Sequence, residues 1–487
     1  MPKVRQANDI NELSSIYIQW IEDLGEVKPC KKCSQNSKKE YYDKNFDLSW
    51  TQDEKYFNKE LSEQLKYIEE NRFQGKHYYV DQSKSGSIKV INEPEYKNHD
   101  FPKESYRFLN LFKYWNIVEY FFPYKYMTDQ PWNEVLSEMI PKFQQVTNVT
   151  EYHLAMLELV TKTNDTHAYF LTEYTTDYFG KKWAPFIYKI IDDRAVIMGF
   201  YSDSLARLNN LHIGDVITHV NEKNISSVIS ETYKYIPASN ETSKLTYTHN
   251  ILFNSNSDSI IIQIVRNDVQ ELKSVATYDF KEFNFSRPIE DKWKILDRNI
   301  GYVNTAYISG KDNVSVINKL KDCEAIIFDF RNGTMANLGI ANQLSKEKRV
   351  FAKYLIPDTT YPGKYYWEEG TISGKKNNYN GKVIVLVNQN TLSQAEFIVM
   401  SIQAAGGNVT TIGSQTAGAD GNVSRYDFLG GFKTQISGIG IYYPDGTPSQ
   451  RTGVKIDIEI HPTIQGIREG RDEVLEAALL YIKNTLE

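Results

Sequence analysis

The fold of this chain is constrained most by short runs of apolar residues that alternate with stretches of helical spacing. Ala325–Phe328 and Val383–Val387 are apolar at every position. A strand of this kind must be covered on both faces, which is typical of a parallel sheet packed between helices. Stretches with helical spacing follow both runs. We therefore predict an α/β domain with a mostly parallel sheet for residues 286–487.

Further elements of this domain follow from the same patterns. We expect helices over residues 314–321, 337–345, 393–405 and 473–484. Residues 456–460 are predicted as an edge strand, and residues 432–436 and 440–443 as the two arms of a hairpin.

The rest of the chain divides into three regions with different patterns. Residues 1–98 have two stretches of helical spacing and are predicted to form an N-terminal helical extension. Residues 99–178 contain an aromatic helical stretch and two more helices, which indicates a helical bundle. Residues 179–285 carry short β-type runs around a helix–turn–strand unit that passes through Gly214 and Asp215. The fold class is therefore multidomain α+β.

Composition narrows the class of protein. The chain has 487 residues, of which 41% are hydrophobic, and a net charge of −6, so it is globular and has no basic half that would bind nucleic acid. No apolar run approaches the roughly 18 residues of a membrane helix, and the start lacks a signal-peptide core. Either the protein is cytoplasmic or an export signal has been removed. No metal-binding or nucleotide-binding motif occurs, so we predict no cofactor.

The three cysteines are too few for a disulfide-built scaffold. Cys30 and Cys33 form a Cys-Lys-Lys-Cys pair that suits a local disulfide, two free thiols or half of a zinc site. Since no second cysteine pair or close histidine pair follows, the zinc site is the least favoured alternative.

Ser393 is the strongest candidate for a catalytic residue in the sequence. A buried strand ends at Val387, a polar turn follows, and a helix begins at Ser393. The N–H groups and partial positive charge of a helix N-terminus stabilise a developing oxyanion. The turn also lies at the carboxyl edge of the sheet, where α/β sites collect. Serine is a favoured helix N-cap as well, so the segment by itself also fits a structural role.

The segment resembles the nucleophile region of the S41 serine peptidases, the C-terminal-processing or tail-specific protease family. Four ordered motifs carry the resemblance, which spans about residues 99–487: Asp329 with Arg331, Asn332 and Gly333; Asn388 with Ser393, Ala395 and Glu396; Gly413 with Thr416 and Gly418; Gly453 with Val454 and Asp457. The resemblance implies a ClpP/crotonase-like catalytic domain at residues 286–487. The Gly214-Asp215 unit similarly resembles a PDZ domain.

The resemblance also implies which residue is the base. Many members use a lysine after the Thr-x-Gly motif, but Ala419 and Asp420 stand there in this chain. The tricorn-like branch uses a histidine in a Ser–His dipeptide, which is similar to Thr166-His167 here. His167 is thus implied as the general base for Ser393. We expect Thr166 to orient the imidazole or relay to a further group, and Gln450 to take the place of that branch's orienting glutamate.

Backbone N–H groups of Gly333 and Gln394 are the expected oxyanion donors. Glycine after a strand end permits close approach of the backbone, although a plain turn explains Gly333 equally well. We assign Asp329 and Asp457, at strand ends, a structural role rather than a hydrolytic one.

We therefore predict a serine endopeptidase that acts on protein or peptide substrates. Its PDZ-like region is expected to bind a substrate tail, by strand addition of an extended peptide, or to gate the cleft. The alternative is an inactive protein on the same fold that binds a peptide or apolar ligand. The resemblance to this family also implies a periplasmic or otherwise extracytoplasmic location and a bacterial source. A third hypothesis is that residues 1–98 block or dock onto the cleft.

Overall fold

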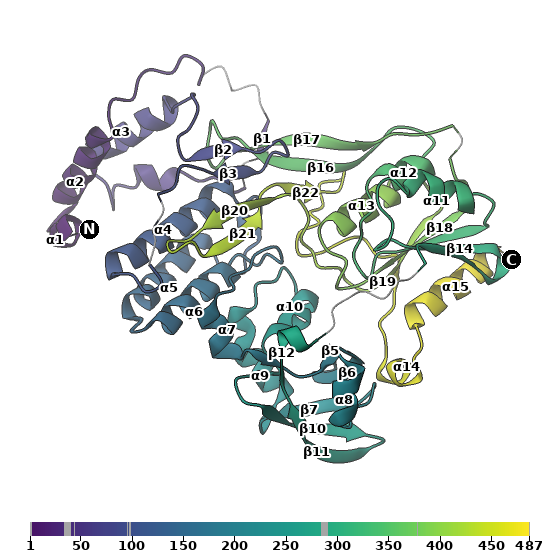
Figure 1. Cartoon of the computed structure of the whole chain (residues 1–487). Coiled ribbons are helices and arrows are strands. Elements are labelled where there is room, and N and C mark those ends of the chain that lie inside the picture. Colours follow the sequence, from purple (N-terminus) through teal and green to yellow (C-terminus); the bar gives the residue numbers. More distant parts are fainter. Residues whose placement is uncertain are drawn as a thin grey trace.

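The computed structural model describes residues 2–33, 40–42, 44–94, 96, 99–283, 291–376 and 378–486. Its central feature is a six-stranded sheet with helices on both faces (Figure 1). In spatial order the strands are β13 (Trp293–Leu296), β14 (Ile300–Asn304), β15 (Ala325–Asp329), β18 (Lys382–Val387), β19 (Val409–Gly413) and β23 (Ile458–Glu459). All neighbours are parallel except β13 and β14. The predicted parallel sheet and its edge strand at 456–460 are confirmed.

The apolar runs are buried on both faces, as the continuous pattern requires. Ile326 and Phe328 of β15 face α11 (Asn313–Leu320), α12 (Gly339–Leu344) and α13 (Gln394–Gln403). Ala325 and Ile327 face α15 (Glu473–Leu486) on the other side. Alternate side chains of one strand therefore fill two separate hydrophobic clusters.

A second sheet, which the sequence patterns did not reveal, lies beside this layer. Its order is β1 (Tyr41–Tyr42), β17 (Tyr365–Ile372), β16 (Arg349–Pro357) and β22 (Gly440–Tyr442). The predicted hairpin of residues 432–436 with 440–443 is wrong. β21 (Lys433–Ser437) pairs with β20 (Val423–Asp427), whereas β22 pairs with β16. Both arms are strands, but each found its partner elsewhere because pairing depends on tertiary packing.

Four helices form a layer beside the β20–β21 hairpin: α4 (Glu104–Phe121), α5 (Trp132–Gln145), α6 (Val149–Thr161) and α7 (Glu173–Phe179). Aromatic and aliphatic side chains of α4, α5 and α6 pack with Tyr426, Phe428 and Ile436 of the hairpin segment. This hydrophobic cluster joins the helical layer to the C-terminal part of the chain.

Residues 182–279 form a separate antiparallel unit with its own hydrophobic cluster. Its larger sheet has the order β11 (Val269–Ala276), β10 (Ser259–Arg266), β7 (Val216–Val220), β6 (Arg194–Phe200) and β5 (Phe186–Ile191), with β8 (Lys223–Asn224) on β7. A smaller sheet joins β12 (Tyr278–Asp279), β4 (Lys182–Trp183) and β9 (Asn254–Ser255). Its helices are α8 (Asp203–Leu208), α9 (Ile225–Thr232) and α10 (Glu241–Tyr247), and α14 (Ile464–Glu469) packs nearby through Ile467.

The N-terminal region contains α1 (Pro2–Gln6), α2 (Ile10–Asp23) and α3 (Lys59–Glu70), and also strands that the helical prediction for residues 1–98 missed. Besides β1, these are β2 (Val80–Gln82) and β3 (Ile88–Val90), which pair as a hairpin. Two of the predicted domain boundaries involve residues that the structure does not describe. These are residue 98 at the 98/99 boundary and both residues of the 285/286 boundary.

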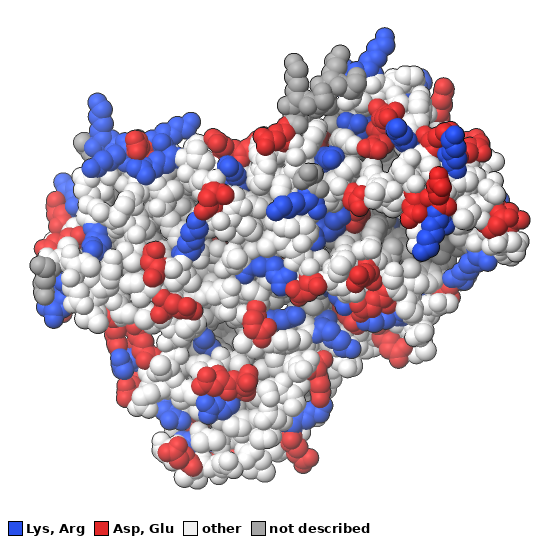
Figure 2. Space-filling model, turned by 180° about the vertical axis from the view of Figure 1, so that it is seen from behind, with Lys and Arg blue, Asp and Glu red and all other residues white. Residues whose placement is uncertain are grey.

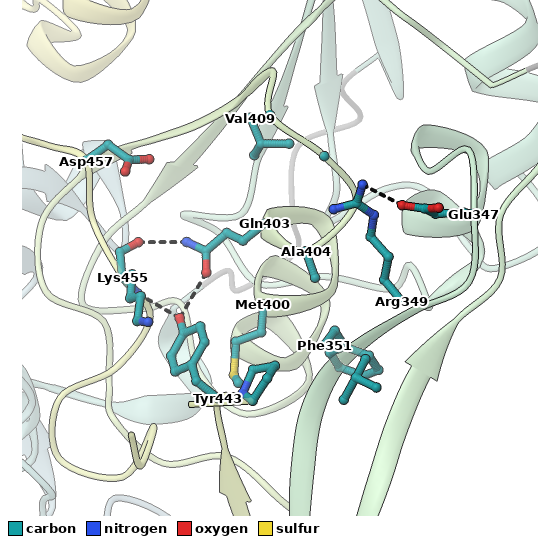
Figure 3. A pocket seen from close by; sticks show the side chains of 14 residues that line it. Glu347, Arg349, Phe351, Met400, Gln403, Ala404, Val409, Tyr443, Lys455 and Asp457 are labelled. Atoms are coloured by element: carbon teal, nitrogen blue, oxygen red, sulfur yellow. Dashed lines mark hydrogen bonds and ion pairs between the residues drawn. The ribbon is translucent and has the colours of Figure 1, made fainter. Parts of the chain in front are cut away.

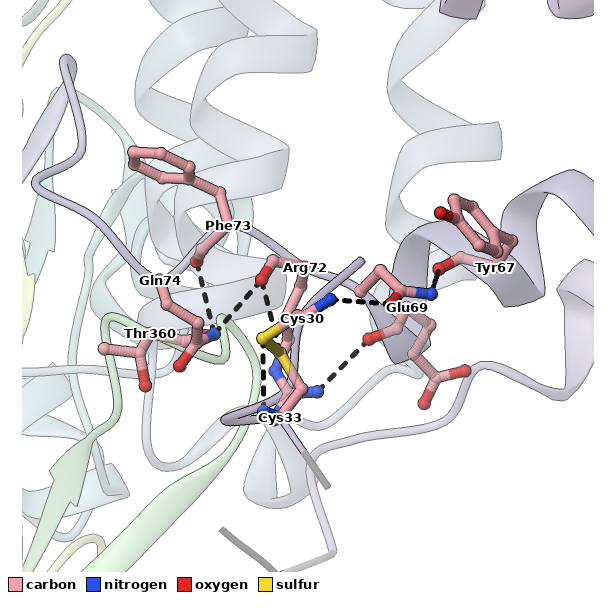
Figure 4. The surroundings of a disulfide bond; sticks show 9 residues. Cys30, Cys33, Tyr67, Glu69, Arg72, Phe73, Gln74 and Thr360 are labelled. Atoms are coloured by element: carbon pink, nitrogen blue, oxygen red, sulfur yellow. Dashed lines mark hydrogen bonds between the residues drawn. A yellow bond between two sulfur atoms is a disulfide. The ribbon is translucent and has the colours of Figure 1, made fainter. Parts of the chain in front are cut away.

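Cys30 and Cys33 are joined by a disulfide, one of the alternatives that the sequence left open (Figure 4). The N–H of Cys30 donates to the Asn71 side chain, which fixes the bridged loop against the end of α3. Close by, the Gln74 side chain donates to the carbonyl of Thr360 between β16 and β17. The N-terminal region is thereby attached to the second sheet.

Charged side chains of both signs are interspersed over the face seen in Figure 2. In the part of the chain that the structure describes, no helix is both long and apolar enough to cross a membrane.

Candidate active site

Ser393 lies where the sequence predicts it, in the turn between β18 and α13. The turn is held locally: the Asn388 side chain accepts from the N–H of Asn390 at 2.8 Å, and the Thr391 hydroxyl donates to the carbonyl of Phe330 at 3.1 Å. Ser393 has φ 55° and ψ −117°, which is a sparsely populated conformation for a residue with a side chain. Strained backbone conformations concentrate at functional sites, and the turns that carry the nucleophile in hydrolases are strained as well.

Glu396 fixes the turn from inside the protein. Its carboxylate is fully buried and accepts four hydrogen bonds: from the Thr416 hydroxyl (2.5 Å) and from the N–H groups of Gly418 (2.8 Å), Ala419 (3.1 Å) and Ser393 (3.1 Å). Burial raises the pKa of Glu396 to about 7, and these donors oppose that rise. One carboxylate therefore connects the turn at Ser393 to the loop of residues 416–419.

His167 is buried, and the hydroxyl of Ser437 connects its imidazole to Asp165. Its Nδ1 lies 2.9 Å from the hydroxyl of Ser437, at the end of β21. That hydroxyl donates to Asp165 Oδ1 at 3.0 Å, and the Ser437 N–H donates to Asp165 Oδ2 at 2.6 Å. The Asp165 side chain is completely buried and also accepts from the N–H of His167. The sequence reasoning missed both Asp165 and Ser437.

These contacts select one tautomer of the imidazole. A carboxylate only accepts, so the Ser437 hydroxyl gives its proton to Asp165 and accepts from His167 Nδ1–H. The lone pair then lies on Nε2, which is buried and has no hydrogen-bond partner among the described residues. Burial lowers the pKa of His167, partly offset by the charge of Asp165. The imidazole is thus neutral near pH 7 and has a free basic nitrogen.

Thr166 and Gln450 lie beside this group, and the hydrogen bonds of their side chains go to residues other than His167. The Thr166 hydroxyl donates to the carbonyl of Ala417 at 3.0 Å and accepts from the N–H of Ser239. Gln450 Nε2 lies 3.4 Å from Asp165 Oδ1 and 3.2 Å from Ser239 Oγ. Gln450 is therefore hydrogen-bonded to Asp165 rather than to His167.

The loop of residues 417–419 brings the serine and histidine segments together. The neighbour of His167, Thr166, binds the carbonyl of Ala417, and the N–H of Ser393 donates to the carbonyl of Ala419 at 3.1 Å. These two anchoring residues are two positions apart, so their Cα atoms lie within about 7.6 Å. Ser393 and His167 are not hydrogen-bonded to each other in this structure. Hydrogen bonds between catalytic groups often form only when substrate is bound.

The two expected oxyanion donors come from neighbouring segments. Gly333 has φ +81°, and its N–H donates to the carbonyl of Phe330 at 3.3 Å. Gln394 is the first residue of α13, and its side chain donates to the carbonyl of Ala336 at 2.6 Å. The Gln394 side chain therefore connects the loop that follows Gly333 to the start of the helix.

Asp329 and Asp457 make structural contacts. Asp329 forms an ion pair with Arg331 at 2.7 Å, and Arg331 also binds Asp472. Asp457 accepts from the N–H of Thr411.

A cavity of about 610 Å³ opens beside Ser393. The β2–β3 turn, residues 82–86 of the N-terminal region, lines one side of it. A second cavity, of about 720 Å³, lies at the other end of α13 around Gln403, Tyr443 and Lys455 (Figure 3). Since Ser393 lines only the first of these cavities, that one is the candidate substrate site.

Comparison with known proteins gives a family match and structural likenesses. Residues 299–460 match the model of peptidase family S41. Mature CPAF has a similar structure, with a TM-score of 0.63 and 13% identity over 78% of this chain and 98% of that one. Mature CPAF complexed with lactacystin gives a TM-score of 0.61 and 13% identity, over 78% and 99%. These identities show a shared fold alone. No curated protein matches the chain.

Proposed function

Because residues 299–460 match the model of peptidase family S41, we propose that the protein is a serine endopeptidase in which Ser393 attacks the peptide bond and His167 is the general base. The observation that carries the assignment is the buried Nε2 of neutral His167, which has no hydrogen-bond partner among the described residues, while Thr166 binds the same loop that anchors the strained Ser393.

The chemistry follows from this arrangement. His167 Nε2 takes the proton of the Ser393 hydroxyl during attack and gives it to the leaving amine. Asp165 acts through Ser437: it keeps the proton on Nδ1 before attack and stabilises the imidazolium afterwards. Asp165 and Ser437 are therefore positioning residues, and the chain uses this pair where the tricorn-like branch is expected to use a glutamate. A water molecule then hydrolyses the acyl-enzyme with His167 again as base.

Backbone N–H groups of Gly333 and Gln394 are proposed to bind the oxyanion. The position of Gln394 at the start of α13 supports its role, because the first N–H groups of a helix have no acceptor within the helix. For Gly333 the role requires its weak 3.3 Å hydrogen bond to Phe330 to be exchanged for one to the oxyanion.

The remaining regions are proposed to serve this activity. The proposed domains are residues 1–98, 99–178, 179–285 and 286–487, the last with a ClpP/crotonase-like sheet, and the separate hydrophobic cluster of residues 184–275 supports the third of them. The third part is proposed as a PDZ-like unit that holds a substrate tail. Its edge strand β5 approaches the nucleophile turn, where Lys189 donates to Gln389 at 3.2 Å. The Cys30–Cys33 disulfide supports an extracytoplasmic location.

Labelling with a fluorophosphonate tests the proposal. We expect one adduct per chain by intact mass, and peptide mapping should place it on Ser393. An adduct elsewhere, or none after long incubation with the full chain, would contradict the assignment. Absence of an adduct together with tight binding of a peptide or an apolar ligand would identify a binding protein on the same fold. That alternative is consistent with the missing hydrogen bond between Ser393 and His167 in the free protein.

The pH dependence of kcat/KM provides a second test. The base must be neutral, and burial places the pKa of His167 below the usual value of about 6.5. Activity is therefore expected to be level from about pH 7 upward to mildly alkaline pH and to fall as pH decreases through the pKa of His167. A profile that still rises steeply above pH 7.5 would exclude His167 as the base and would indicate a group of higher pKa.

A further inference from the structure

Apolar side chains form part of the wall of the cavity beside Ser393. Tyr354 and Ile356 of β16, Phe397 of α13 and Ile441 of β22 line it, together with Ser393 itself. Its volume of about 610 Å³ is in the range of cavities that enclose small ligands, about 300–1,000 Å³. Such walls suit the hydrocarbon part of a substrate side chain that enters next to the reacting serine.

One lining residue is a buried acid. Asp420 is 2% exposed, and its Oδ1 accepts from the N–H of Gly421 at 2.6 Å. Its Oδ2 is buried and has no hydrogen-bond partner among the described residues. Buried polar atoms are nearly always hydrogen-bonded, and an unpaired carboxylate oxygen in an apolar site is costly. Asp420 Oδ2 therefore lacks a hydrogen-bond partner that a bound molecule can supply.

The electrostatics of the cavity favour a cationic donor. Glu368 of β17 also lines the cavity, at an exposed position. Burial raises the pKa of Tyr354 to about 12, and Asp420 and Glu368 both add to that rise. Burial and the neighbouring Glu396 likewise hold the pKa of Asp420 well above its usual value. The exposed Lys84 is the only basic residue among the described residues that line the cavity, and it lies on the β2–β3 turn.

We propose that Asp420 determines specificity, and that the protein prefers substrates that place a lysine or arginine side chain in this cavity beside Ser393. The inference rests on the proposed peptidase function and names its substrate class. The aliphatic stem packs on the apolar side chains of the wall, and the cationic end donates to Asp420 Oδ2. Hydrogen bonds between charged groups are roughly twice as strong as neutral ones, whereas a side chain that ends in a methyl group leaves Asp420 Oδ2 without a partner.

Two peptidyl diphenyl phosphonates test the preference, one with lysine and one with norleucine at the position next to phosphorus. The two side chains have the same carbon stem and differ in the terminal group. On the wild-type full chain we expect the lysine probe to label Ser393 at least tenfold faster than the norleucine probe. Equal rates, or faster labelling by norleucine, would overturn the proposal even if both probes react with Ser393.

Asp420→Asn is the matching variant, and Asp427→Asn, an exposed acid on β20, is its control. Each rate is divided by the rate of fluorophosphonate labelling of the same variant, so a general loss of serine reactivity cancels. We expect the lysine-to-norleucine ratio to fall to about 1 in Asp420→Asn and to keep its wild-type value in Asp427→Asn. A wild-type ratio in folded Asp420→Asn would assign the selectivity to another residue.

A binding measurement separates this inference from the catalytic one. Fluorescence anisotropy with Ser393→Ala uses labelled peptides that differ only in lysine or norleucine at one position, and needs no reaction. Tighter binding of the lysine peptide, by at least tenfold, would support the site even if the wild-type protein fails to react with any phosphonate. Equal affinities would overturn the site, whatever the outcome of labelling.

Discussion

Replacement of Ser393 by alanine is expected to reduce kcat/KM for peptide cleavage by at least about 10⁴-fold. The reason is the loss of the only atom that forms the acyl bond, while the turn that holds residue 393 depends on backbone and Glu396 contacts that alanine keeps. Steady-state hydrolysis of a quenched peptide measures the loss, and a thermal melt close to wild type would show that the fold is intact.

Ser401→Ala is the matched control for this variant. Ser401 lies on the same helix, and its hydroxyl is buried against the carbonyl of Ile398. We expect kcat/KM within about threefold of wild type. If Ser393→Ala retained more than about a tenth of the wild-type activity, the nucleophile would have to be another group.

Replacement of Asp165 by asparagine is expected to reduce kcat by about 10² to 10⁴-fold with little change in KM. An asparagine amide donates to Ser437, so the hydroxyl of Ser437 turns its proton toward His167 Nδ1. The remaining imidazole proton then lies on Nε2, and the base is lost in that tautomer. Hydrolysis of the same quenched peptide measures kcat and KM separately.

The pH profile distinguishes this role from a purely structural one. The charge of Asp165 raises the pKa of His167, so its removal should move the acid limb of kcat/KM to lower pH while the plateau falls. General destabilisation would lower the plateau without moving that limb. Asp445→Asn, which breaks an exposed ion pair with Lys455, should change neither the limb nor the plateau.

The local pattern of the chain was sufficient to predict the nucleophile turn. A run of apolar residues that ends at Val387 and a helix that begins after Ser393 depend on neighbours in sequence, so the strand, turn and helix could be predicted. The dipeptide Thr166-His167 was found only through resemblance to a family. The strained φ of Ser393 has no sequence signal, because serine rarely adopts it and the loop of residues 416–419 imposes it.

Pairing between distant segments could not be predicted, and the hairpin shows why. The strands that end at Ser437 and begin at Gly440 are adjacent in sequence, and the short connection favoured pairing with each other. In the fold, β21 packs on the helical layer through Ile436, whereas β22 joins β16. Burial of apolar surface against different layers therefore decided the pairing, and it placed Ser437 next to His167.

The sequence by itself determined the parallel sheet and the position of Ser393 at the carboxyl end of one strand. A strand that is buried on both faces needs an apolar residue at every position, and such a run is visible in the sequence. Only the tertiary structure decided that Ser437 connects Asp165 to His167 by hydrogen bonds, and that Asp420 Oδ2 has no hydrogen-bond partner among the described residues in the cavity beside the serine. Asp165 and Ser437 are 272 positions apart along the chain, and a hydrogen bond between them exists only once the helical layer and the β20–β21 hairpin have packed into one hydrophobic cluster.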